Sequence, residues 1–168
     1  MRSTQWAARL ATDPCPGAGV ARVQAPDGTP VIVVNLIGRV FMNAYEDPFR
    51  TLDAILRELD PGPRVVIVDF HAEATSEKVA MGWYADGRVS AVVGTHTHVT
   101  PADERVLPDG TAYITDLGMT GPYDSVIGVE KEAVLQRFLT GMRTRFETAK
   151  GDPRFAAAIV EADPETGL

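Results

Sequence analysis

Four segments rich in apolar and β-branched residues recur along the chain, and they constrain its fold more than any other feature. The first two show no alternation of apolar and polar residues, which is typical of strands covered on both faces. Between the segments the spacing becomes helical, as in Leu52, Ile55 and Leu59. The alternation of strands and helices predicts an α/β architecture. The predicted strands are Val31–Leu36, Arg64–Phe70, Val89–Gly94 and Thr111–Asp116.

Turn and cap residues delimit the other predicted elements. Pro48 suits the first turn of a helix that ends before Pro61. Further helices are predicted at Thr75–Tyr84 and Lys131–Arg143, and further strands at Val20–Gln24 and Arg154–Ala162. A length of 168 residues suits one domain, which we place at 1–168.

Composition excludes several classes of protein. The net charge of −7 offers no basic surface for nucleic acid. The longest apolar run is far shorter than the roughly 18 residues of a membrane span, and the first residues lack the apolar core of a secretory signal. The single cysteine, Cys15, excludes an internal disulfide and a paired-cysteine metal site. We expect a cytoplasmic protein without a membrane partner.

The chain has three histidines, and each follows an apolar strand. Ligands gather beyond the carboxyl ends of strands in open α/β sheets. His96 and His98 are two residues apart, so in extended backbone their side chains point the same way. Neutral imidazole is a common ligand of zinc, iron and similar ions. We therefore predict that His71, His96 and His98 border one metal-binding cavity.

Other polar residues near these strand ends have two interpretations each. Asp69 and Glu73 could orient an imidazole from behind, or they could simply end a strand and cap a helix. Thr120 and Gly121 belong to a glycine-rich turn that could line a phosphate pocket or be a plain turn. Lys78, Arg39 and Arg88 could meet a phosphate, but we expect each to be a solvated surface charge.

Several longer motifs resemble the YmdB-like bacterial metallophosphoesterases, in the same order and spacing over about residues 12–165. The motifs are Asn35-Leu-Ile-Gly-Arg39, Asp69-Phe-His-Ala-Glu-Ala-Thr-Ser-Glu-Lys78, Val93-Gly-Thr-His-Thr-His-Val99 and Tyr113-Ile-Thr-Asp-Leu-Gly-Met-Thr-Gly-Pro122. The resemblance implies a calcineurin-like α/β/β/α sandwich and two divalent metal ions, iron or manganese. It implies hydrolysis of small phosphodiesters, namely 2′,3′- and 3′,5′-cyclic nucleotides, with His71, His96 and His98 as metal ligands.

The resemblance is partial. This sequence has no counterpart of three motifs of the family: the Gly-Asp motif that ends its opening strand, the Gly-Glu-Asn motif and the Gly-Asn-His motif. The only asparagines in the sequence are Asn35 and Asn43, and neither precedes a histidine. Those motifs supply the bridging carboxylate and the general acid in the family. We therefore expect the C-terminal portion of such a domain, with residues 1–11 matching poorly. Because the bridging carboxylate and the general acid are missing, we expect little activity from this chain alone. An incomplete sandwich also exposes apolar sheet surface, so we expect a homo-oligomer.

Two other functions compete with this interpretation. The chain could be a catalytically silent oligomerisation or partner-binding domain descended from such an enzyme. A His-x-His amidohydrolase would need an eight-stranded barrel of about 250 residues, for which this chain is too short.

Overall fold

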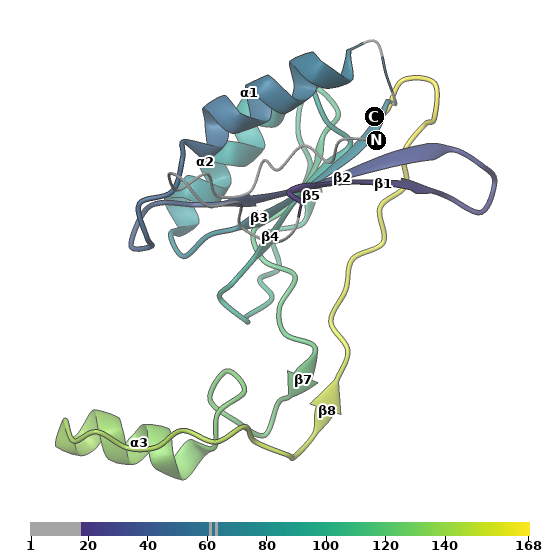
Figure 1. Ribbon diagram of the computed structural model, residues 1–168. Coiled ribbons are helices and arrows are strands. Elements are labelled where there is room, and N and C mark those ends of the chain that lie inside the picture. The colour runs from purple at the N-terminus through teal and green to yellow at the C-terminus, as the bar shows by residue number, and fades with distance from the viewer. Residues whose placement is uncertain (1–17, 61, 63) are drawn as a thin grey trace.

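The computed structural model describes residues 18–60, 62 and 64–168. Its main sheet has six strands in the order β1-β2-β3-β4-β6-β5 (Figure 1). The central strands β2, β3, β4 and β6 are parallel, and β1 and β5 pair antiparallel at the two edges. The strands are β1 Val20–Gln24, β2 Pro30–Ile37, β3 Val65–His71, β4 Ala91–Thr95, β5 Arg105–Val106 and β6 Ala112–Ile114. The α/β class is thus confirmed.

Two helices cover one face of this sheet (Figure 1). Helix α1, Pro48–Leu59, begins where the Asp47 carboxylate accepts hydrogen bonds from the amides of Phe49 and Arg50. Helix α2, Thr75–Ala85, follows β3 closely. The helices and the sheet share one core, in which Leu52, Phe70 and Met81 have no exposed surface.

The opposite face of the sheet is only partly covered, which differs from the expectation of full cover. Ile32 and Val68 on the helix face are at most 1% exposed, whereas Val31, Val33 and Ile67 on the other face are intermediate. A groove of about 440 Å³ lies here, lined by apolar residues of β2, β3 and β4 and of the C-terminal segment. Within the described residues, no second large sheet completes a sandwich.

The predicted strand Arg154–Ala162 is wrong. Only Pro153–Arg154 forms a strand, β8, which pairs with β7 Gly121–Pro122. The residues after it have no strand to pair with, and Phe155 and Ile159 are 82% and 95% exposed. A β-branched sequence does not form a strand without a neighbour for its backbone groups.

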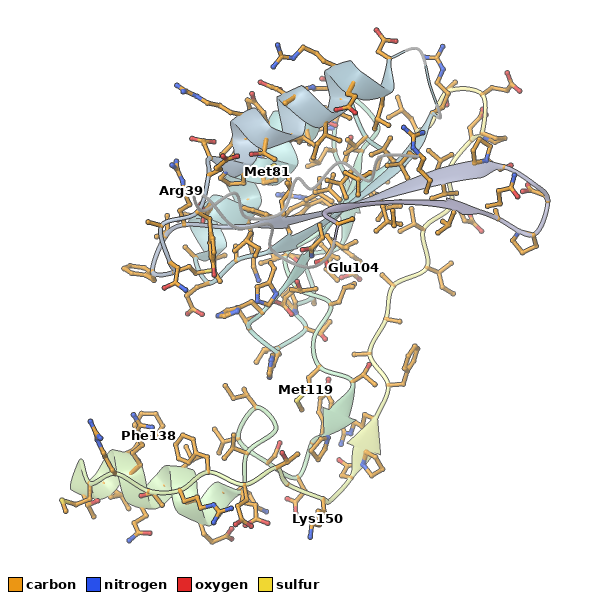
Figure 2. The ribbon with its side chains drawn as sticks, in the orientation of Figure 1. Arg39, Met81, Glu104, Met119, Phe138 and Lys150 are labelled. Atoms are coloured by element: carbon orange, nitrogen blue, oxygen red, sulfur yellow. The ribbon has the colours of Figure 1, made fainter. Side chains whose placement is uncertain are left out.

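Helix α3, Lys131–Thr140, lies apart from the main sheet (Figure 1). It ends three residues before the predicted Arg143, because Gly141 adopts a left-handed backbone with φ of 69° and caps the helix. Figure 2 shows Phe138 on this helix, far from Met81 in the core. No helix among the described residues is both long and apolar enough to cross a bilayer.

The expectation that Lys78 is a solvated surface charge is also wrong. Its side chain is 1% exposed, and its Nζ lies 2.6 Å from Oδ2 of Asp116, which is equally buried. Burial by itself would raise the pKa of Asp116, but hydrogen bonds from Lys78, Thr97 and Gly118 hold that pKa below its usual value. The sequence did not reveal this contact because Lys78 and Asp116 are 38 residues apart.

The core position of Phe70 leads to a stability prediction. Phe70→Ala should lower the free energy of unfolding by about 3–5 kcal/mol, because it removes a buried ring and leaves a cavity. Phe138, 81% exposed, offers the matched control, and Phe138→Ala should change the same quantity by less than about 0.5 kcal/mol. Urea titration of both variants measures the difference. Equal losses would contradict the described core.

The lowered pKa of Asp116 leads to a prediction about acid stability. A carboxyl with a lower pKa in the folded state contributes stability above its unfolded pKa of about 3.9, and this contribution disappears as the pH falls through the folded pKa. The unfolding free energy of the wild type should therefore fall more steeply below about pH 4 than that of Asp116→Asn. Urea titrations from pH 3 to pH 7 test this, and parallel curves would refute it.

Candidate metal centre

The parallel register of β3 and β4 brings two of the three histidines together. His71, the last residue of β3, pairs with Thr95, the last residue of β4, and His96 follows directly. The Nε2 atom of His71 lies 3.0 Å from Nδ1 of His96, and the rings meet edge to face with centroids 4.7 Å apart. The predicted neighbourhood of these two residues is therefore present at the carboxyl edge of the sheet.

A chain of hydrogen bonds orients His71 from behind. The Thr95 hydroxyl donates to Oδ1 of Asp69 at 2.8 Å, so its oxygen accepts from Nδ1 of His71 at 3.1 Å. Asn35 donates to the other oxygen of Asp69 at 2.7 Å. Nε2 of His71 therefore carries the lone pair that a metal ligand needs. Asp69 thus acts on the imidazole through Thr95 rather than by direct contact.

Electrostatics favour the neutral form of His71. Its pKa is lowered, first by burial, which penalises the imidazolium, and second by the neighbouring His96 ring. Asp69 opposes this shift. A neutral imidazole offers its lone pair to a metal without first losing a proton.

Glu73 contacts His96 instead of capping helix α2. Its Oε2 lies 2.9 Å from Nε2 of His96. The N-cap residue of α2 is Ala74, which makes no side-chain cap bond. Both ring nitrogens of His96 thus have partners, and a metal bound to either nitrogen would replace one of these contacts.

His98 is oriented by a backbone carbonyl and not by a side chain. Its Nδ1 lies 2.9 Å from the carbonyl oxygen of Ile127, which can only accept, so in the neutral ring Nε2 is unprotonated. The backbone of both histidines is left-handed, with φ of 105° at His96 and 66° at His98. Residues other than glycine adopt this conformation at a cost of about 1–3 kcal/mol when the surrounding structure holds them there.

Thr120 and Gly121 contact the C-terminal segment. The hydroxyl of Thr120 lies 3.2 Å from the amide nitrogen of Ala156, from which it accepts, and Gly121 pairs with Arg154 in the small sheet. Both residues therefore have a structural role, and their part in substrate binding stays a prediction.

The donor chemistry of the site fits a divalent metal, although the coordination sphere is not assembled. Nδ1 of His71 and of His98 each has an oxygen partner, the arrangement that fixes metal-binding imidazoles. Among the residues that the structure describes, no three His, Cys, Asp or Glu side chains form a cluster ready to hold an ion. The convergence of His98 with the other two histidines stays a prediction.

Sequence reasoning missed the roles of Asn35 and Thr95. Asn35 pairs in register with Asp69, and Thr95 with His71, so both lie on the same face as the site. One signal was available, because Asn35 is the only polar residue in the apolar run from Val31 to Ile37. A polar side chain in a buried strand needs a partner, and here the partner is Asp69.

The chain is similar to several known proteins. Over 151 residues the chain is 49% identical to the 2′,3′-cyclic-nucleotide 2′-phosphodiesterase of Bacillus subtilis, covering 90% of this chain and 57% of that protein. The crystal structure of a hypothetical protein from Thermus thermophilus superposes with a TM-score of 0.79 at 48% identity, covering 88% of this chain and 56% of that one.

A novel phosphatase from Mycoplasma pneumoniae superposes with a TM-score of 0.72 at 40% identity, covering 80% of this chain and 48% of that one. The chain spans about half the length of the curated relatives that it matches. The family model of the YmdB-like proteins matches residues 10–168. The chain therefore belongs to the YmdB-like protein family.

Proposed function

We propose that this chain contributes the histidine-bearing part of a metal-dependent phosphodiesterase that acts on 2′,3′- and 3′,5′-cyclic nucleotides. The observation that carries the proposal is the pairing of His71 with His96 at the carboxyl edge of the sheet, with His71 oriented through Thr95 and Asp69. The name of the Bacillus subtilis relative supports a phosphodiester as the substrate.

Each histidine has a proposed part in holding metal. Nε2 of His71 and Nε2 of His98 are the unprotonated nitrogens that would hold an ion, and His96 would contribute a nitrogen in place of its contact with Glu73 or with His71. When bound, two divalent ions, iron or manganese, supply Lewis-acid stabilisation of the negative charge on the phosphoryl oxygens. Asp69, Thr95 and Asn35 keep the His71 ring in place while the substrate binds.

This chain by itself is proposed to turn over little substrate. Its sequence contains neither the Gly-Glu-Asn nor the Gly-Asn-His motif of the family. A two-metal site needs its ions about 3.5–4 Å apart. Neutral imidazoles do not offset the charge of two such ions, and a bridging carboxylate would do so.

Exposed apolar residues on α3 favour a second candidate function, a domain that oligomerises or binds a partner. Leu135, Phe138 and Leu139 are 55%, 81% and 84% exposed, and such a group of apolar side chains marks an association surface. Sedimentation of the wild-type chain and of Leu139→Ser measures this contribution. Self-association that Leu139→Ser abolishes would support the second candidate.

The role of Asp69 can be tested by metal titration. Asp69→Asn should weaken Mn²⁺ binding by about 10–100-fold, because an amide can donate to Thr95 and disturb the acceptor that faces His71. Asp53→Asn is the matched control, since Asp53 accepts from Tyr84 and Arg88 away from the histidines. Isothermal titration with Mn²⁺ measures both. Equal affinity in Asp69→Asn and wild type would contradict the assignment.

The proposed activity can be tested by supplying the rest of the fold. The chain is mixed with the part of the Bacillus subtilis relative that lies outside the 151 matched residues. Hydrolysis of 2′,3′-cyclic AMP in Mn²⁺ or Fe²⁺ should appear only in the mixture and be lost with His96→Ala. The same assay with 3′,5′-cyclic AMP tests the broader substrate range. Rapid turnover by the chain alone would refute the proposed inactivity, and turnover that survives His96→Ala would refute the site.

A further inference from the structure

The buried carboxylate of Asp116 holds the backbone of the loop that carries His96 and His98. Its Oδ2 accepts from the amide of Thr97 at 3.0 Å as well as from Lys78 at 2.6 Å. Its Oδ1 accepts from the amide of Gly118 at 2.8 Å. Thr97 is the residue between the two histidines, so this one carboxylate acts on the centre of the His-Thr-His segment.

The backbone of this segment needs such an anchor. His96 and His98 both have positive φ, a conformation that residues with side chains rarely adopt. The Thr97 amide between them is fastened to a side chain that cannot move into solvent, because Asp116 is 1% exposed. Without that hydrogen bond, the segment could relax to ordinary backbone angles, and both imidazoles would change direction.

Lys78 connects this anchor to the other side of the site. It lies on α2, the helix that follows His71 and Glu73. Its stem passes Gly94, where a Cβ would lie 3.2 Å from Cδ of Lys78 and would overlap the carbonyl oxygen of Thr115. Glycine at position 94 therefore lets Thr115, which directly follows β6, and the lysine stem approach β4 closely, beside the contact of the ammonium with Asp116.

Glu77, the residue before Lys78 on α2, also holds a loop through its carboxylate. The buried carboxylate of Glu77 accepts from the amides of Arg39 and Val40, at 2.9 Å and 3.2 Å. Gly38, just before them, donates its amide to the carbonyl of His71 at 2.9 Å. The first turns of α2 thus hold the loops after β2 and β4, on either side of His71.

We propose that Lys78 and Asp116 are positioning residues of the metal centre: their buried ion pair fixes the Thr97 amide and thereby the directions of the His96 and His98 side chains. This inference rests on the proposed function for its metal. The ion pair itself touches neither metal nor substrate. Its buried charges would cost stability without their hydrogen bonds, and one of those bonds is the bond from the Thr97 amide.

The decisive variant replaces both charges in the full chain. Lys78→Met with Asp116→Leu replaces the ion pair by apolar side chains of similar length and branching, leaves no unpaired buried charge and removes the acceptor of the Thr97 amide. Amide hydrogen exchange by mass spectrometry then reports on residues 95–99 and 116–118. Isothermal titration with Mn²⁺ reports on the histidines. Leu52→Ala, in the core between α1 and the sheet, is the control for general loss of stability.

We expect the double variant to exchange faster at residues 95–99 and to bind Mn²⁺ at least tenfold more weakly than wild type. Leu52→Ala should leave both readouts near wild type under conditions where it stays folded. A folded double variant with wild-type protection and affinity would overturn the proposal, as would equal losses in Leu52→Ala.

Two further variants cover the remaining cases. If the double variant does not fold, Asp116→Asn replaces it, because an amide has one accepting oxygen and cannot accept from Thr97, Gly118 and Lys78 as the two carboxylate oxygens do. Faster exchange at residues 95–99 and weaker Mn²⁺ binding would again support the proposal, and wild-type values would overturn it. Lys78→Arg keeps the charge and should retain more of the Mn²⁺ affinity than Lys78→Met. A wild-type chain that binds no Mn²⁺ would contradict the proposed function, while exchange at residues 95–99 still decides the positioning role.

Discussion

Parallel pairing of β2, β3 and β4 is the constraint on which the candidate site depends. Parallel strands end at one edge of a sheet, so residues that close separate strands become neighbours. His71 and Thr95 are such a pair, and His96 extends from the second of these strands. The helices α1 and α2 cover one face of the same strands, and residues such as Leu52 and Phe70 are buried between them.

Polar side chains at this edge of the sheet are linked by hydrogen bonds. Asn35 and Thr95 both donate to Asp69, and Thr95 in turn accepts from His71. Within the part of the chain that the structure describes, no buried side-chain nitrogen or oxygen lacks a hydrogen-bond partner. A satisfied polar network holds one geometry, because each alternative arrangement would leave a buried group unpaired.

The open face of the sheet and helix α3 both carry apolar side chains that the described residues leave partly exposed. The groove beside Val31, Ile67 and Val93 is apolar, and α3 exposes Phe138 and Leu139. The relatives are about twice as long as the matched segment, and the chain shares its family with them. The catalytic proposal concerns the histidines at the carboxyl edge of the sheet, and the association proposal concerns α3, so the two involve different surfaces of one molecule.

The sequence by itself determined the local elements, the three histidines after strands and the family. β1 has the predicted bounds, and β2, β3 and α2 begin and end within one residue of theirs, because β-branched runs and helix-forming segments act locally; Pro48 likewise begins α1 as predicted. Tertiary structure alone decided the contacts between distant residues. It placed Lys78 on Asp116, gave Asn35 and Thr95 their partner, and left residues after Arg154 without a strand. The physical reason is that strand register and the burial of long side chains depend on which segments pack together, and no local pattern encodes that choice.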